Sequence, residues 1–411
     1  SIGAEILVSN AHIEVNEFLY LEGGLSFSKG TSFNATINNG DILGADQQTS
    51  QASVNVMSIG GYDLSGFAGI GSNSEDRDSE DRVGFKLNDV TFVAALMETE
   101  ITSFPPLYLY NTSFISAKAT IGSAKLVGME SVVDGELHDV DININMGNSP
   151  LVILNGAKPF IDFKATANSE GQDIRVKTGY KSVGEEVENK DYMILSSSEN
   201  IAEISIGYAE LSMVGALQVR GAVTFSRKVE DVYLDPPLTI ADPVSSLGLF
   251  SESEAVSVET LSIGINNAYG FIGVGSYYND TNNDNIIDDL DTVNENAVGF
   301  AIDNLDLGAV LMKGTALEPQ SLIKYFAVNA SLNSAKLVGL GDSINAEVDN
   351  FTFKVNTSIL NKITLGNLGP VVDFSRSGDN GSAYKIKSGN DTTCISLDYD
   401  SFLVQTSGHM N

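Results

Sequence analysis

The chain repeats itself, because five blocks of its first half return in the same order in its second half. The paired blocks are 4–28 and 202–226, 54–72 and 258–276, 83–97 and 298–312, 119–129 and 330–340, and 159–163 and 370–374. Five blocks in one order are not expected from chance alignment. They predict a tandem array of two repeats of about 200 residues, 1–200 and 201–411, and not a single catalytic globule.

The last residues of the chain resemble the start of a further copy. The segment 394–399 weakly repeats 203–208, which fits equally the opening strand of a third repeat and an ordinary terminal strand. The chain also starts inside a repeat and without an initiator methionine. These features predict a mature or excised piece of a longer polypeptide.

The charge of the chain limits its partners. Its 54 acidic and 23 basic residues give a net charge of −31. This charge argues against nucleic acid and against an anionic membrane surface, and it favours cation binding. An apolar run long enough for a membrane-spanning helix is also missing from the sequence, so we expect no membrane insertion. The single cysteine, Cys394, is expected to be a small core residue.

Apolar residues alternate with small or polar ones over long stretches. Ile13, Val15, Leu19, Leu21, Leu25 and Phe27 occupy odd positions, and their counterparts in the second copy do the same. This period of two predicts half-buried strands longer than average. We therefore expect an all-β fold: an elongated, β-solenoid-like tandem array, with two antiparallel β-sandwich domains of long strands as the alternative.

The alternation changes phase at matching places in both copies. Phe85 and Leu87 are odd whereas Val90 and Phe92 are even, and the block around 300–307 shows the reverse change. A change of one residue requires a corner or a bulge, since the core face would otherwise turn to solvent. Gly23 and Gly221 mark the corresponding place in the first strand pair, where we predict a bend.

One loop differs sharply between the copies, because residues 277–297 replace the shorter stretch 73–82. Counted from Asp280, oxygen-bearing side chains occupy positions 1, 3, 5, 9 and 12. The predicted metal ligands are Asp280, Asn282, Asp284, Ile286 through its carbonyl oxygen, Asp288 and Asp291. Alternate oxygens on a tight turn converge within about 2.5 Å of a hard cation, so the loop predicts calcium.

The calcium loop departs from the usual pattern at two positions. Asn285 stands where glycine is usual, and asparagine adopts the left-handed conformation most readily after glycine. Asp291 replaces the usual glutamate at position 12. A solvated acidic loop is the alternative, and it is the preferred interpretation of residues 73–81, which are fewer and include Arg77.

The sequence holds no pattern typical of a catalytic centre. His12, His138 and His409 are scattered, and no neighbouring residues complete a triad or a metal motif. We therefore predict no enzymatic activity. The alternatives are a polysaccharide-active enzyme on a β-solenoid and a carbohydrate-binding module, for which the candidate aromatic residues are Tyr108, Tyr110, Tyr277 and Tyr278.

Three of the repeated blocks carry a family resemblance. They are Gly-Phe-x-Gly-Ile/Val-Gly before the acidic loop, Val-Gly-Phe with a distal Ala-x-Leu-Met, and Ser-Ala-Lys-Leu-Val-Gly. Together they resemble repeat modules of very large exported bacterial surface or adhesin-like proteins, and the loop resembles those of EF-hands and dockerins. The resemblance implies an extracellular structural or adhesive module at the cell surface or in a filament, stabilised by calcium. Its partners would be neighbouring repeats or copies, and surface glycans.

Overall fold

The fold is nearly all β, as the sequence predicts. In this computed structural model the described residues are 3–15, 19–38, 49–70, 82–99, 112–129, 131–148, 159–179, 192–213, 216–235, 255–281, 291–315, 323–341, 346–360, 363–364, 369–378, 381–389 and 393–410. They contain strands and one short helix, α1 (Phe163–Glu170). No described helix has the length and hydropathy to cross a bilayer.

Each repeat contributes six long strands. In the first repeat these are β1 (Ala4–Val15), β2 (Leu19–Asn38), β3 (Thr49–Ile70), β4 (Val83–Thr99), β5 (Ser113–Val127) and β6 (Val133–Asn148). In the second they are β10 (Asn200–Met213), β11 (Leu217–Val232), β13 (Val256–Val274), β16 (Val298–Gly314), β17 (Ile323–Val338) and β18 (Glu347–Leu360). The terminal strand is β23 (Leu403–Met410).

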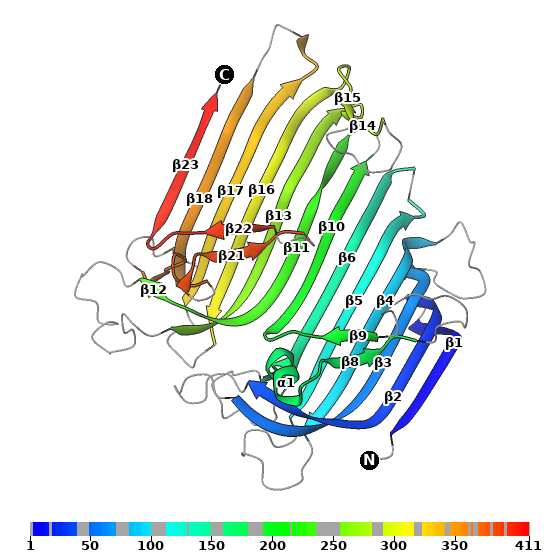
Figure 1. Ribbon diagram of the computed structural model, residues 1–411. Coiled ribbons are helices and arrows are strands. Elements are labelled where there is room, and N and C mark those ends of the chain that lie inside the picture. Colours follow the sequence, from blue (N-terminus) through cyan, green and yellow to red (C-terminus); the bar gives the residue numbers. More distant parts are fainter. Residues whose placement is uncertain are drawn as a thin grey trace.

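These strands lie side by side in a single antiparallel sheet (Figure 1). The described residues give it 15 strands, with the long ones in chain order and β6 paired with β10. Both repeats therefore share one sheet and do not form two separate sandwiches in the described part of the chain. The β-solenoid is not confirmed, because consecutive strands run antiparallel and do not stack as coils.

A crease crosses the sheet where the sequence predicts its phase changes. Among the described residues, six other than glycine have a positive φ, between 50° and 54°: Asp63, Asp89, Asp139, Asn267, Asn304 and Asn350. Asp and Asn tolerate this left-handed conformation better than other residues with a side chain. The ladder of β1 and β2 shifts opposite Gly23, and that of β10 and β11 opposite Gly221, so the predicted bends are confirmed.

Short elements from each repeat cover one face of the sheet (Figure 1). In the first repeat they are β7 (Phe160–Ile161), α1, β8 (Ile174–Lys177) and β9 (Tyr192–Leu195). In the second they are β12 (Leu234–Asp235), β20 (Val371–Val372), β21 (Tyr384–Lys387) and β22 (Cys394–Leu397). Each set buries a hydrophobic core against its own half of the sheet, centred on Phe163 in one repeat and Phe374 in the other.

The opening strand of the predicted third copy is not at 394–399. Cys394–Leu397 forms β22 and pairs with β21, as β9 pairs with β8 in the first repeat. The long sheet instead receives β23, which pairs with β18. The prediction fails because both segments alternate, and alternation does not identify the partner of a strand. Cys394 is also exposed and not a core residue.

A buried asparagine joins the covering elements to the sheet in each repeat. The Asn145 amide donates to the carbonyl oxygens of Ile161 at 2.8 Å and Glu199 at 2.9 Å. Asn356 makes the equivalent contacts with Val372 and Ser401, both at 2.9 Å. The end of each covering segment is thereby held where the next long strand begins.

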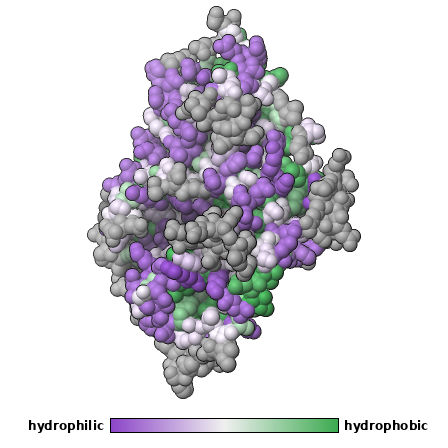
Figure 2. Space-filling model, turned by 45° about the vertical axis from the view of Figure 1, so that its right-hand side comes forward, coloured by the Kyte–Doolittle hydropathy of each residue, from purple (hydrophilic) through white to green (hydrophobic). Residues whose placement is uncertain are grey.

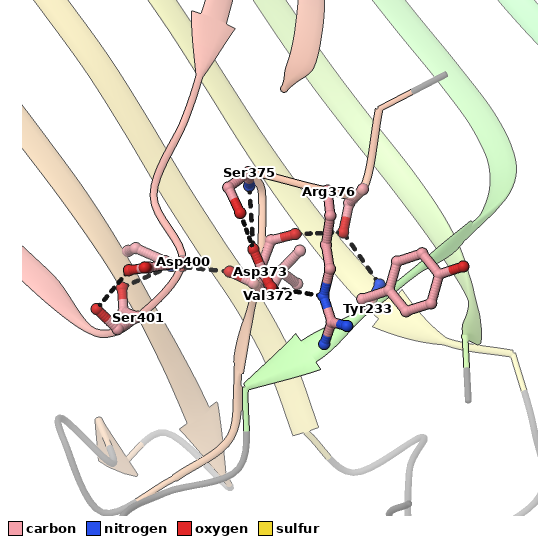
Figure 3. A network of polar contacts seen from close by, with 9 residues as sticks. Tyr233, Val372, Asp373, Ser375, Arg376, Asp400 and Ser401 are labelled. Carbon is pink, nitrogen blue, oxygen red and sulfur yellow. Dashed lines mark hydrogen bonds and ion pairs between the residues drawn. The ribbon is translucent and has the colours of Figure 1, made fainter. Parts of the chain in front are cut away.

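The repeated Pro-x-x-Asp-Phe block forms a turn beside this asparagine. Asp162 caps α1 by accepting from the backbone N–H of Ala165 at 2.8 Å. Asp373 takes the same place in the second repeat, where its carboxylate accepts from the Ser375 N–H at 3.1 Å and pairs with Arg376 at 2.6 Å (Figure 3). The block is therefore repeated because it stabilises the turn that starts each covering segment.

The opposite face of the sheet carries a continuous apolar row. Residues directly opposite each other in a ladder share a face, so the strand registers define the row. It runs through Val8, Leu25, Gly61, Phe92, Ala119, Ile142, Ile204, Phe225, Ile263, Ala309, Val328, Val355 and Val404. Every one of these residues is apolar or glycine. We call it the apolar row.

Candidate functional sites

The two ends of the predicted calcium loop lie together. The short strands β14 (Tyr278–Asn279) and β15 (Thr292–Val293) pair, which brings Asp280 and Asp291 to the same end of a hairpin. The Asp291 carboxylate accepts from the backbone N–H of Thr281 at 2.8 Å and from its hydroxyl at 3.3 Å. The first and last predicted ligands are therefore neighbours, as a closed ion-binding loop requires.

The four central ligands of the prediction, Asn282, Asp284, Ile286 and Asp288, lie outside the described residues. Among the residues that are described, no group of three or more His, Cys, Asp or Glu side chains is arranged to hold a metal ion. The base of the loop is thus defined by the structure, and calcium binding stays a prediction.

The base of this loop is held firmly to the sheet. Gln218 of β11 accepts from the backbone N–H groups of Tyr277 at 2.7 Å and Tyr278 at 3.1 Å. The Tyr278 hydroxyl donates to the Asp303 carboxylate at 2.9 Å. Burial raises the pKa of Tyr278, and the Asp303 carboxylate raises this pKa further, so the hydroxyl remains a donor.

Two of the tyrosines proposed for carbohydrate binding are core residues. Tyr277 is 4% exposed and Tyr278 is 7% exposed, and both pack in a cluster with Phe271. Their rings therefore have no face available for a sugar. Tyr108 and Tyr110, the other two candidates, lie outside the described residues.

A groove that sequence analysis misses opens beside the crease in the first repeat. Its volume is about 390 Å³, within the usual range of small-ligand sites. It is lined by Tyr62, Asp63, Asp89, Thr91, Thr120, Tyr192 and Met193. The guanidinium of Arg175 lies 4.3 Å from the centre of the Tyr192 ring. Carboxylates, hydroxyls and phenol rings thus meet in one depression, although they come from four separate strands.

The second repeat has different residues at the positions that line this groove. Asn267 and Asn304 replace Asp63 and Asp89, and Cys394 pairs with Lys387 as Tyr192 pairs with Lys177. In the second repeat the carboxylate of Asp306 accepts a hydrogen bond from the Asn267 N–H at 2.8 Å. In the first repeat the hydroxyl of Thr91, at the position of Asp306, accepts from the Asp63 N–H at the longer distance of 3.5 Å. Residues that serve the fold recur in both copies, so residues unique to one copy are candidates for a separate role.

The two outer long strands of the sheet are exposed. Within the described residues, β1 pairs only with β2, and β23 pairs only with β18. Ile6 of β1 is 57% exposed and Val404 of β23 is 64% exposed. Leu403 of β23 lies opposite Asn356, as Ile201 of β10 lies opposite Asn145. The terminal strand β23 therefore pairs with β18 in the same register in which β10 pairs with β6.

Comparisons with protein-family models, with curated proteins and with solved structures find no match for this chain.

Proposed function

We propose that this chain is an extracellular structural module that joins like modules by extending its β-sheet. The observation that carries the proposal is the shared register of two joints. The first repeat meets the second through β6 and β10, and β18 receives β23 in the equivalent register. An arrangement that already joins two repeats in one sheet can join further ones by the same backbone hydrogen bonds.

The exposed outer strands support this proposal. An unpaired strand edge presents N–H and C=O groups at the spacing that another strand requires. The outward side of β23 corresponds to the side through which β10 pairs with β11. A strand from a neighbouring module could therefore pair with β23 in the way that β11 pairs with β10 inside the chain.

Calcium binding to the loop at 280–291 is the second part of the proposal. Asp280 and Asp291 lie at the base of one hairpin, and a divalent ion would relieve the mutual repulsion of the loop carboxylates. The base of the loop is already held to the sheet by Gln218, so an ion bound at 280–291 would not need to rearrange the sheet. Extracellular calcium concentrations suit weak sites of this kind.

Deletion of residues 402–411 tests the proposed assembly. This change removes β23 but leaves the β21–β22 hairpin and the contact between Asn356 and Ser401. We expect the truncated chain to self-associate less than the intact chain at equal concentration in sedimentation velocity. Equal self-association of both chains, with the truncated one folded by circular dichroism, would show that β23 is not the joining strand.

Carbohydrate binding is the alternative function, and the groove beside the crease favours it. Carboxylate pairs accept hydrogen bonds from sugar hydroxyls, and tyrosine rings pack against the apolar face of a sugar. Tyr62→Ala should abolish binding of neutral oligosaccharides in a calorimetric titration, whereas Asn266→Ala at the matching position should not. If the intact chain binds no oligosaccharide in a glycan array, this alternative fails.

A further inference from the structure

The sheet face opposite the hairpins exposes many large apolar side chains. Phe225 in the apolar row is 47% exposed and Ile204 beside it is 43% exposed. In the neighbouring row on the same face, Leu261 is 56% exposed and Leu311 is 41% exposed. Soluble proteins rarely leave a broad contiguous apolar surface uncovered. This face therefore has the character of an interaction surface.

The repeat provides an internal comparison for these exposed residues. Leu96 is 47% exposed and its counterpart Leu311 41%, while Ile70 and its counterpart Val274 are each 74% exposed. Exposed surface positions have no reason to stay apolar in both copies unless something covers them. Exposed apolar positions therefore recur at equivalent places in both repeats, on β3 and β4 in the first and on β13 and β16 in the second.

Hydrophilic side chains dominate the surface seen in Figure 2, with hydrophobic ones gathered toward its right-hand and lower margins. The hairpin-bearing face is already covered by cores around Phe163 and Phe374. The two faces of the sheet therefore differ: hairpins cover one, whereas on the other a buried cluster around Leu64 and Leu87 lies beside the crease and the large apolar side chains further along the strands are exposed.

We propose that the apolar face is covered by the same face of a second copy, so that two sheets pack into a two-layer dimer. Sheets pack face to face at about 10 Å with their strands nearly aligned. The apolar row and the row from Ile6 to Thr357 beside it supply 13 and 12 positions. Among them Val328, Val355 and Thr357 are buried, and Arg227 is charged and paired with Glu259, which leaves about twenty positions for contact. A standard interface uses about 20–30 residues on each side, so the face has the extent that a stable dimer needs.

The charges at the margin of this face indicate that a second copy covers it, and they also indicate how that copy is oriented. Glu98 and Lys313 occupy matching positions in the two repeats, and each lies two residues beyond an exposed leucine of the apolar face. A two-fold axis parallel to the strands reverses the strand order of the partner while keeping the same strand ends together. The first repeat of one copy then lies over the second repeat of the other, which brings opposite charges to the same margin.

A membrane surface fits these charges less well than a second copy. The chain has a net charge of −31, which disfavours approach to anionic lipid. Glu98 and Lys313 instead suit a two-fold contact between identical copies, because each can face its opposite charge in the partner. The proposed interface does not involve the outward edge of β23, so it is independent of sheet extension.

The test uses the chain lacking 402–411, so that edge pairing through β23 does not contribute, and measures mass by sedimentation equilibrium. We expect a dimer. Phe225→Asp places a charge in the centre of the interface and should weaken dimerisation more than about tenfold. Leu7→Asp is the matched control, because Leu7 is 43% exposed on the opposite face of β1 from Ile6.

Charge reversal tests the orientation. Glu98→Lys and Lys313→Glu should each weaken the dimer, and the double variant should restore it. A monomer at all concentrations would overturn the proposal, as would equal effects of Phe225→Asp and Leu7→Asp. Binding of the monomer to phosphatidylcholine vesicles through the same face would identify lipid as the occupant and likewise overturn it.

Discussion

The side-chain amide of Asn356 donates a hydrogen bond to the backbone carbonyl oxygen of Ser401 at 2.9 Å. The same amide donates to Val372, so one buried residue fixes both ends of the covering segment between β18 and β23. Asn145 does this between β6 and β10. The joint between the repeats and the position of the terminal strand thus rely on the same device.

Replacing Asn356 with alanine should destabilise the fold by about 1–3 kcal/mol, because the buried carbonyl oxygen of Val372 and the partly buried one of Ser401 lose their donor. Urea unfolding measures this change. Asn145→Ala should have a similar effect, whereas Asn329→Ala, which removes an exposed contact with Ser396, should have little. Amide exchange in 403–410 should also become faster in the Asn356 variant. Unchanged amide exchange in 403–410 would mean that Asn356 does not hold β23 in place.

Backbone conformation at the crease gives a second prediction. Asn304 has a φ of 54°, and a β-branched residue is strained in that region. Asn304→Val should therefore lower the free energy of unfolding by about 1–2 kcal/mol, while Asn304→Gly should be tolerated. Lys86→Val, at an exposed strand position, is the control. A valine variant as stable as the glycine variant would mean that the crease does not depend on this conformation.

Calcium should raise the melting temperature of the chain, because the ion binds the folded loop. Asp284→Ala should remove most of this rise by deleting a central ligand, and Asp291→Ala should do so by opening the base of the loop. Asp78→Ala, in the shorter loop of the first repeat, serves as the control. Thermal unfolding with calcium and with chelator measures the difference. A full calcium response in the Asp284 variant would place the ion elsewhere.

The pH dependence of stability should include a contribution from Glu210. Burial raises the pKa of this carboxyl, although the Tyr208 hydroxyl, which donates to it at 2.5 Å, lowers the pKa. A carboxyl with a raised folded-state pKa favours folding below its unfolded-state pKa, and this contribution is lost as pH rises through the folded-state value. Glu210→Gln should therefore raise the melting temperature at pH 7.

The gain from Glu210→Gln should shrink as the pH falls toward 4, since the wild-type carboxyl then becomes protonated. Melting temperatures measured between pH 4 and pH 8 check this trend. Glu14→Gln, at an exposed position, provides the comparison in the same pH series. A gain that does not change with pH would have to come from packing and not from the charge.

The local features of the fold were predictable because they depend on neighbouring residues. Alternation identified the long strands, and the phase changes around Asp89 and Asn304 located the crease. The matching glycines, Gly23 and Gly221, located the bends of the first strand pair in each repeat. The spacing of residues 280–291 predicts a calcium loop, and the structure adds only that Asp280 and Asp291 lie at the same end of one hairpin.

The groove could not be predicted, because its residues are far apart in the sequence and carry no common motif. Tyr62 and Tyr192 meet only because the β9 segment returns over the sheet. The one available signal was negative: these residues are not repeated in the second copy. Conversely, the sequence predicts Tyr277 and Tyr278 as exposed aromatics, yet they are buried in a cluster with Phe271.

By itself the sequence determined the repeat, the strands and the places where they bend, since side-chain alternation follows directly from the backbone period of two. Only the tertiary structure decided that β6 joins β10, that 403–410 and not 394–397 enters the long sheet, and which face remains uncovered. Those outcomes depend on hydrogen bonds between distant segments. Any alternating strand can satisfy such bonds, so the choice of partner is made by packing and by buried anchors such as Asn356.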